Sequence, residues 1–541
     1  MTAIRTLYHL ARADFLERVR RYSFLVLVGA TIYLGYLFVP PTDAAYQTVA
    51  LGDARGIYNS AWVGAMFGLM ISTLVTLIAF YPIKNTVARD RETQVGQIIA
   101  ATPLRKPVYV LGKWLSNVAL LTLLLCVMTG MAAAMQWMRA EEAHIDLAAL
   151  AAPLWWIAFP ALCLVAAVAV LFECVPFLRG GVGNVVYFFL FMGVLTAWIA
   201  GADGEIMKTV NDPFGISYTI ANMQRAVRTH DPNYAGEVAI GGAAFSAQPL
   251  IFRWDGIAWT AEMILGRLLW VGIAALLALA AALPFDRFDP ARGRPRRRVG
   301  AREDATDVAP SLASEGTAGA SADNEPVRAA HLTPLAAGRL RPRLPYLVWA
   351  ELRLMVKGRR LWWYAAVVGL NAAGLAVPDQ TVRGYLQAAA WLWPILLWSS
   401  IGSRERRHNT QQIVFSAPHP VGRQMLAAWL AGVCVAVSTG VGFAAQRMLT
   451  GQWAGLGAWA AGALFVPSLA LALGTWSGSS RTFEVVYTLL WYVGPMNHVP
   501  ALDYMGVTPE AVAGRIPLYY LSASGVLLVL AMLGRWRQTR Q

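Results

Sequence analysis

The sequence predicts an all-α polytopic membrane protein of twelve transmembrane helices, arranged as two six-helix repeats that each begin with an interfacial elbow helix. Of the 541 residues, 57% are hydrophobic and only 14% are charged, a composition too apolar for a soluble protein of this size. Twelve apolar stretches reach or approach the roughly 20 residues that cross a bilayer. The order of these stretches repeats on either side of a polar segment, which indicates internal duplication.

The twelve spans also predict how the chain is oriented in its membrane. They are expected at residues 23–40, 61–83, 115–135, 148–172, 183–201, 259–284, 361–377, 385–401, 424–445, 454–474, 483–496 and 515–533. A cytoplasmic N-terminus then places 35 of the 45 Lys and Arg residues on the inner side, as the positive-inside rule requires. We therefore expect a multi-pass protein of the bacterial inner membrane with both termini cytoplasmic. This topology explains the net charge of +14 without nucleic-acid binding.

Composition divides the chain into two halves and a linker. Residues 1–284 form the first predicted repeat, which includes an outside segment at 202–258, and residues 345–541 form the second. Residues 285–344 are rich in Arg, Pro, Gly and Ala, which is typical of a flexible linker. Its arginine cluster is either part of a solvated tether or a contact for anionic lipid headgroups.

Each half opens with a predicted amphipathic helix. Apolar residues recur at helical spacing in both segments, beside charged residues on other faces: Ile4, Leu7, Ala11, Phe15 and Val19 in the first half, and Val348, Leu352, Met355 and Val356 in the second. Helices of this kind lie in the headgroup plane and do not span the bilayer.

A charged loop follows the second predicted span of each half. The first loop runs from Arg89-Asp90-Arg91-Glu92 through Gln97-Ile98-Ile99 to Thr102-Pro103, and the second from Arg404-Glu405-Arg406-Arg407 through Gln412-Ile413-Val414 to Ala417-Pro418. At an offset of 315 the identical pairs are Arg89/Arg404, Arg91/Arg406, Gln97/Gln412, Ile98/Ile413 and Pro103/Pro418. Alternating charges before an apolar patch suit a short helix that docks in a groove of a soluble partner. The alternative is a solvated loop that only satisfies the positive-inside rule.

The elbow helix, the two following spans and the charged loop with its Thr-Pro end resemble the type 2 ABC permease family, once in each half. The resemblance implies a separate ABC ATP-binding subunit, in two copies, that carries ATP and Mg and docks on these loops. It implies a substrate exported outward and no cofactor bound by this chain. The segment with Asp212-Pro213-Phe214-Gly215 is similar to a subgroup whose members sometimes continue into a zinc aminopeptidase, whereas this sequence ends at Gln541.

Sequence motifs for enzymatic chemistry are absent. Gly112-Lys113 is followed by Trp114 and not by Ser or Thr, so no phosphate-binding loop of an ATPase is present, and no His-Glu-x-x-His helix exists. We expect a permease subunit that is not an enzyme. Two alternatives remain open: a membrane-embedded enzyme acting on lipid-linked substrates, and a non-transporting mechanical or signalling ABC component.

Charges within the predicted spans are sparse. Glu173, Glu262 and Arg267 are the intramembrane polar candidates, with Glu484 at the mouth of the eleventh span, because such residues often mark ion pathways. Glu262 and Arg267 are alternatively a structural ion pair. The outside segment contains enough aromatic residues for a small folded cap that either shields the outer vestibule or binds substrate or a periplasmic partner. These aromatic residues are Phe214, Tyr218, Tyr234, Phe245, Phe252 and Trp254. The substrate itself is not identified, although an amphipathic molecule would suit an interface open to lipid.

Overall fold

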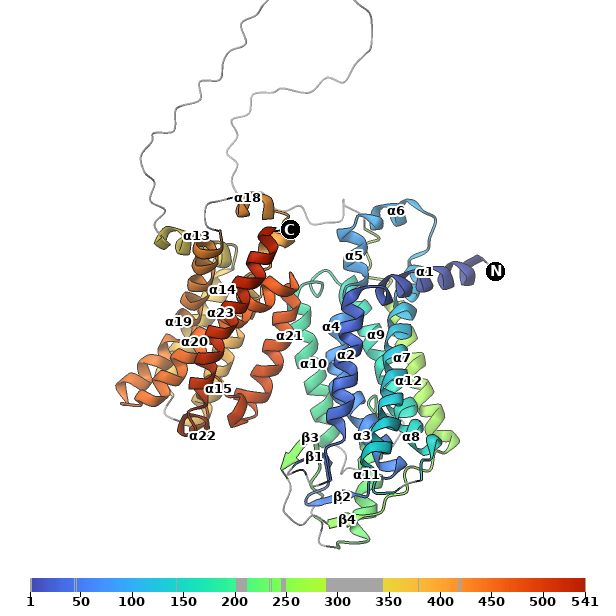
Figure 1. Ribbon diagram of the computed structural model, residues 1–541. Coiled ribbons are helices and arrows are strands. Elements are labelled where there is room, and N and C mark those ends of the chain that lie inside the picture. Colours follow the sequence, from blue (N-terminus) through green and yellow to red (C-terminus); the bar gives the residue numbers. More distant parts are fainter. Residues whose placement is uncertain are drawn as a thin grey trace, which may run out of the picture.

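The computed structural model consists mainly of helices, gathered into two bundles that lie side by side (Figure 1). It describes all residues except 1, 43, 45, 143, 201–211, 233, 235, 245–249, 289–343, 378, 417–419 and 541. Nearly all of the predicted linker, and Ala417-Pro418 of the second charged loop, therefore lie outside the described residues.

The first bundle comprises residues 2–288. Its elements are α1 (Thr2–Val19), α2 (Tyr22–Phe38), β1 (Tyr46–Ala50), β2 (Ala54–Gly56), α3 (Ser60–Met70), the π-helix η1 (Ile71–Val75), α4 (Thr76–Ile83), α5 (Thr86–Glu92), α6 (Val95–Ala101), α7 (Lys106–Arg139), α8 (Leu147–Pro153), the π-helix η2 (Leu154–Ala158), α9 (Phe159–Cys174), α10 (Gly181–Ala200), α11 (Ile216–Arg228), β3 (Ala239–Ala244), β4 (Leu250–Phe252) and α12 (Ala261–Ala280).

The second bundle begins at Leu344. Its elements are α13 (Leu344–Val356), α14 (Leu361–Ala376), α15 (Gln380–Leu392), α16 (Ile395–Trp398), α17 (Arg404–Arg407), α18 (Gln411–Phe415), η5 (Pro420–Gln424), α19 (Met425–Leu449), α20 (Trp453–Ser477), α21 (Ser480–Trp491), η6 (Tyr492–Met496), η7 (Pro500–Leu502), α22 (Pro509–Ala513) and α23 (Ile516–Arg540).

The described chain has eight helical segments long and apolar enough to cross a membrane. They run over Ser60–Glu92, Lys106–Arg139, Leu147–Cys174, Gly181–Trp198, Ala261–Ala280, Gly422–Leu449, Trp453–Ser477 and Ile516–Thr539. Each coincides with one of the twelve predicted spans, so a polytopic membrane protein is confirmed. The stretches expected at 23–40, 361–377, 385–401 and 483–496 form shorter or broken helices. Proline accounts for two of these breaks, since Pro394 separates α15 from α16 and Pro495 lies in η6.

The N-terminal helix α1 turns sharply into α2. The two axes differ by 77°, and α1 lies across the end of the bundle while α2 runs along it (Figure 1). If this bent pair is counted as one span, the described chain has up to nine. This orientation is that of the predicted elbow, but the charged face of α1 is not turned away from the bundle, because Asp14 is buried while Ile4 of the expected apolar face is exposed.

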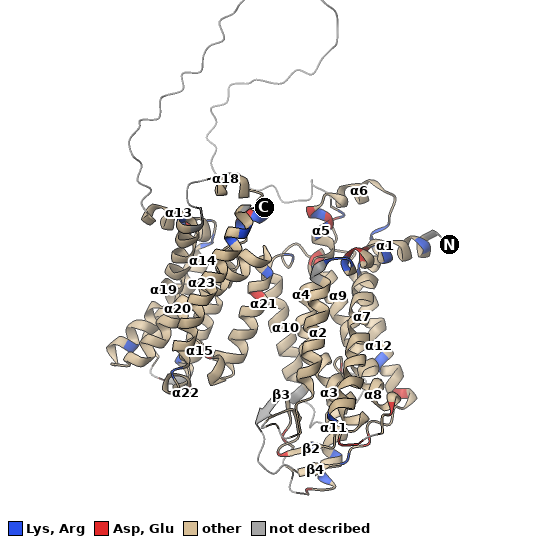
Figure 2. Cartoon of the chain, viewed as in Figure 1, with Lys and Arg blue, Asp and Glu red and all other residues tan. Residues whose placement is uncertain are grey.

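The two ends of the molecule differ in composition and structure. We call the end that carries α1, α5, α6, α13, α17 and α18 the loop face, and the opposite end, with the four strands, α11 and α22, the sheet face (Figure 1). Charged side chains concentrate at these two ends and are rare along the helices between them (Figure 2). This distribution is expected where the middle of each helix contacts lipid.

The mostly helical chain also has four short strands at the sheet face, which the sequence did not predict. There β1 pairs with β3 in antiparallel fashion, and β2 pairs with β4 in parallel fashion. The predicted cap therefore includes the loop before α3 as well as the segment 202–258. Phe252 and Trp254 are buried in it, each against the ring of Trp62. Of the other expected cap aromatics, Phe214 is also buried, whereas Phe245 lies outside the described residues.

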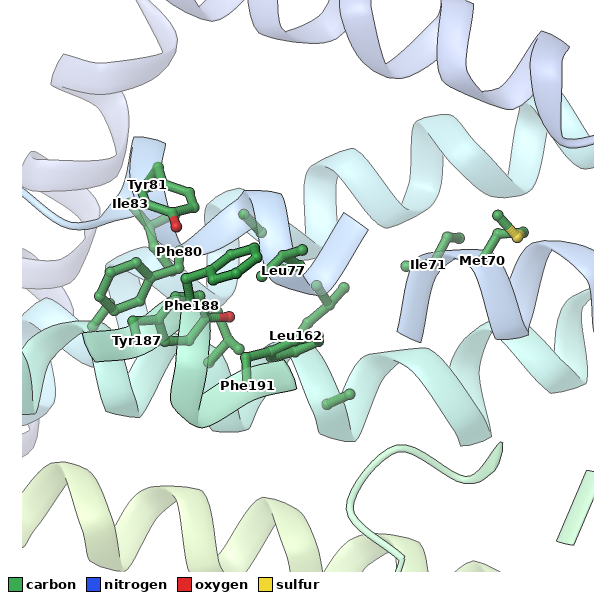
Figure 3. Packing of buried hydrophobic residues seen from close by; sticks show 14 of the residues in the cluster. Met70, Ile71, Leu77, Phe80, Tyr81, Ile83, Leu162, Tyr187, Phe188 and Phe191 are labelled. Atoms are coloured by element: carbon green, nitrogen blue, oxygen red, sulfur yellow. The ribbon is translucent and has the colours of Figure 1, made fainter. Parts of the chain in front are cut away.

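The core of the first bundle is aromatic on its loop-face side (Figure 3). The rings of Phe80 and Tyr187 stack with their centroids 3.7 Å apart, and Phe172 meets both edge-on. These contacts join α4, α9 and α10. They hold the end of α4, from which the first charged loop begins, in one place relative to two neighbouring helices.

Candidate functional site

The two charged loops have the same local backbone plan. In the first, α5 and α6 are separated at Gln94, whose φ is 61°, and in the second, α17 and α18 are separated at Asn409, whose φ is 53°. These residues are 315 positions apart, the same offset that aligns the two sequences. A left-handed conformation is uncommon outside glycine, so its recurrence at matched positions indicates that both loops turn in the same way.

Each loop presents an exposed isoleucine on its second helix. The Ile98 side chain on α6 is 68% exposed and that of Ile413 on α18 is 77% exposed. Gln97 and Gln412, the preceding residues, are also exposed. These four residues form what we call the loop tips. The matched apolar side chains at the loop face are features that a soluble partner would cover.

The ions of the first loop have partners inside the chain. The Arg89 guanidinium lies 2.8 Å from an Asp14 oxygen and 2.6 Å from a Glu17 oxygen, both on α1. Asp90 lies 2.8 Å from Lys113 Nζ of α7. Both side chains turn toward the bundle and tether α5 to the elbow helix and to α7. The expected docking of this loop on a soluble partner stays a prediction.

Asp14 is the centre of this network. Its carboxylate accepts hydrogen bonds from Lys113 Nζ at 2.9 Å and from Ser116 Oγ at 2.6 Å, and Arg18 lies 3.3 Å away. The side chains of Asp14 and Lys113 are only 4% and 3% exposed. Such burial is tolerated only because each charge has opposite charges and hydrogen bonds around it. We call this set of contacts the Asp14 network.

Two further contacts fix the ends of α5. Glu173 accepts hydrogen bonds from the backbone N–H groups of Thr86, Val87 and Ala88 at 2.6–3.0 Å, so it caps the N-terminus of α5. At the other end Arg91 pairs with Asp286 at 2.9 Å, while Glu92 is exposed. Glu173, one of the intramembrane candidates, therefore stabilises the loop.

The second loop is tethered to its own elbow helix in the same way. Arg404 lies 2.8 Å from Glu351 of α13, so in both bundles the first arginine of the loop pairs with an elbow acid. Burial raises the pKa of the Glu351 carboxyl above its ordinary value, although Arg404 opposes this effect. Glu405 lies 3.4 Å from Arg535 of α23, whereas Arg406 is exposed.

The proposed ion pair between Glu262 and Arg267 does not form. Arg267 is buried and donates to four backbone carbonyls, those of Trp156, Ile157, Asp212 and Pro213, while Glu262 is exposed. Residues five apart on a helix do not share a face, since only positions three or four apart meet. Glu262 and Arg267 therefore lie on different faces of α12.

A buried polar chain joins the two bundles. Lys84 Nζ, at the end of α4, donates to Asn184 Oδ1 at 2.8 Å, and Asn184 Nδ2 donates to Glu484 Oε2 at 2.5 Å. Asn184 lies on α10 and Glu484 on α21, and these helices also pack through the rings of Phe189 and Trp491. The contact sets the position of one bundle relative to the other at the level of the charged loops.

Sequence reasoning missed the residues that anchor the loops. Asp14, Glu351 and Lys113 were not singled out, and neither were Lys84 and Asn184. A charge next to an otherwise apolar span was an available signal for both lysines. The elbow acids gave no local signal, because acidic residues are common on amphipathic helices.

No protein-family model matches the chain, and no curated protein matches it significantly.

Proposed function

We propose that this chain is the membrane-spanning permease of an ATP-driven ABC export system, powered by a separate ATP-binding subunit. In this proposal twelve membrane segments form two six-helix repeats, both termini are cytoplasmic, and the loop face is the cytoplasmic face of a bacterial inner membrane. The helices α2, α14, α15–α16 and α21–η6 take the four places in the repeat that the eight long spans leave open.

The observation that carries the proposal is the pair of matched loops. Each has a left-handed residue between two short helices, an exposed isoleucine on the second helix, and an arginine paired with an acid of the adjacent elbow. A loop that merely supplied positive charge would need none of these three features. Their recurrence favours two equivalent docking sites, one for each of two ATPase subunits.

A second matched pair of turns supports the duplication. At the sheet face Asp212 accepts hydrogen bonds from the N–H groups of Phe214 and Ser217 at 2.8 and 2.7 Å. Asp503 accepts from Met505 and Thr508 at 3.1 and 2.7 Å, in the same two-residue and five-residue spacing. A glycine with positive φ follows at the same place in both turns: Gly215 at 69° and Gly506 at 66°.

The tethering of the loops supports a lever mechanism. An ATPase subunit that grips the loop tips would move α6 or α18 when its two copies close on ATP and Mg. The Asp14 network would pass that movement from α5 to α1 and α7, because buried ion pairs resist separation. The Lys84–Asn184–Glu484 chain lies where the bundles would shift against each other. Such a shift would change the side to which an amphipathic substrate between them is exposed.

The test is partner capture through the loop tips. A chain tagged at Gln541 is solubilised gently with a non-hydrolysed ATP analogue, and copurifying proteins are quantified by mass spectrometry. We expect an ATPase at about two copies per chain, and a loss of at least tenfold in the double variant Ile98→Asp, Ile413→Asp. Ile251→Asp is the matched control, because Ile251 is an exposed isoleucine on β4 at the opposite face.

The wild-type chain and the double variant each provide a way to refute the proposal. If no ATPase copurifies with the wild-type chain, the export-permease proposal fails. If the ATPase is retained by the double variant, the loop tips are not the docking sites. If the ATPase is captured as expected, stimulation of ATP hydrolysis by an exported substrate would distinguish transport from a purely mechanical role.

A further inference from the structure

A pocket of about 560 Å³ opens at the sheet face of the second bundle. It lies between the start of α15, the turn that joins α19 to α20, and the segment from Gly506 to α22, which Figure 1 places together at one end of the bundle. The lining includes Arg383, Gln446, Arg447, Trp453, Thr508 and Val512. A volume of this size lies in the range of small-molecule sites. We call it the α19–α20 pocket.

Arg447 is the buried charge of this pocket. Its guanidinium donates to Gln387 Oε1 at 2.6 Å and to the carbonyl of Gly506 at 3.3 Å. Within the part of the chain that the structure describes, no carboxylate forms an ion pair with it. Asp503 lies on the same turn, but its oxygens accept hydrogen bonds from Met505, from the Thr508 N–H and from the Thr508 hydroxyl. A buried cation without an ion-pair partner favours an anion from outside.

The equivalent turn of the first bundle shows what a closed version looks like. There Arg267 donates to four backbone carbonyls, and the cavity beside it is only about 20 Å³. Trp259 and two residues of α11 line this cavity, so the cap fills the space. The second bundle has the five-residue α22 in place of the longer α11. Its arginine is left facing an open pocket.

Other residues of the α19–α20 pocket indicate the chemistry of the occupant. Arg383 brings a second guanidinium to the pocket, and its Nε and Nη2 donate to the carbonyl of Val377. Gln446 has a buried side-chain oxygen that has no hydrogen-bond partner among the described residues. The absence of a side chain at Gly455 leaves room beside Arg447, since a Cβ there would lie 3.1 Å from Nε. Trp453 and Val512 supply apolar surface.

We propose that the α19–α20 pocket binds an amphipathic anion, with its phosphate or carboxylate group held by Arg447 and Arg383 and its apolar part against Trp453 and Val512. Guanidinium groups recognise both anions through paired N–H donors. The site requires neither ATP nor a partner protein, so it does not depend on the export function proposed above.

The test is calorimetric titration of the purified full chain in an uncharged maltoside detergent at constant ionic strength. Hexyl phosphate and hexanoate are the probes, and hexanol is the uncharged match. We expect saturable one-to-one binding of at least one anion and none of hexanol. Arg383→Gln should weaken binding at least tenfold. Arg253→Gln, a change at an exposed arginine of the same face, should leave it unchanged.

A blocking variant keeps the proposal testable if loss of an arginine disturbs folding. Ala513→Trp fills the pocket from its exposed rim while both guanidiniums remain, and it should also weaken binding at least tenfold. Absence of saturable binding to the wild-type chain, or equal affinity in both pocket variants, would overturn the proposal. In lipid nanodiscs, competition by phosphatidylglycerol but not phosphatidylcholine identifies a lipid headgroup as the source of the anion, and lack of competition identifies a soluble anion.

Discussion

Removing the Asp14 charge should destabilise the chain far more than removing the equivalent charge of the second bundle. Asp14→Asn keeps the size of the side chain but takes a negative charge from among Lys113, Arg89 and Arg18. Glu351→Gln takes one from beside Arg404. The two changes are chemically alike, so a difference between them measures how deeply each elbow acid is embedded.

The magnitudes follow from burial. Breaking a fully buried ion pair costs about 3–5 kcal/mol. Lys113 keeps Asp90 and Arg89 keeps Glu17 as remaining partners, so Asp14→Asn should cost about 3 kcal/mol, the lower end of this range. The side chains of Arg404 and Glu351 are 24% and 16% exposed, and Glu351→Gln should cost about 1 kcal/mol.

The free energy of unfolding can be measured by titrating sodium dodecyl sulfate into mixed micelles and following tryptophan fluorescence. Glu142→Gln is the control, because its partner Arg253 is more than half exposed and the cost should stay below about 0.5 kcal/mol. Equal losses for Asp14→Asn and Glu351→Gln would refute the reasoning from burial. A loss at Asp14 no larger than the control would show that the network does not hold the elbow.

Three further predictions concern pH, topology and the bundle interface. The hydrogen bond from Arg55 holds the pKa of Glu141 below its ordinary 4.5. The extra unfolding free energy of the wild type over Glu141→Gln should therefore be complete above pH 4.5 and shrink as the pH falls through the lowered pKa. A difference in unfolding free energy that stays constant with pH would contradict this. A cysteine replacing Asp255 should react with an impermeant thiol reagent added outside intact cells, whereas one replacing Thr93 should react only after permeabilisation, and reversed labelling would invert the proposed topology. Glu484→Ala should increase hydrogen exchange in α10 and α21 together, and unchanged exchange would show that the buried chain does not hold the bundles.

The long spans could be predicted from the sequence because lipid imposes a length and a composition that any sufficiently apolar stretch reveals. The cap strands could not. β1 and β3 pair across almost two hundred residues, and β3 reads Ala-Ile-Gly-Gly-Ala-Ala, in which Ile240 is the one residue of the β-branched or aromatic types that mark a strand. The helix break at Pro394 shows a second limit of prediction from sequence. An apolar stretch predicts that its residues are buried, but not that they form one continuous helix.

The sequence predicted that the charged loops repeat, but it did not predict which residues hold each loop against its bundle. The match between Ile98 and Ile413 follows from an alignment of one half on the other. The partner of Arg89 does not, because Asp14 lies 75 residues away on a helix whose direction relative to the loop depends on the whole bundle. The repeated sequence pattern therefore located the surface that a partner would contact. Only the tertiary structure identified the buried residues that would carry the movement of that surface into the bundle.

This division assigns separate tasks to residues that adjoin in sequence. The exposed isoleucines are available to a partner, whereas Arg89, Asp90 and Arg404 face elbow helices or spans of their own bundle. Charge reversal at Arg89 and Asp90 should therefore leave ATPase capture intact and uncouple ATP hydrolysis from transport. Substitution of Ile98 and Ile413 should abolish capture itself. If both kinds of variant lost the ATPase equally, the charged residues would have to contact the partner directly, and the lever would have no basis in the Asp14 network.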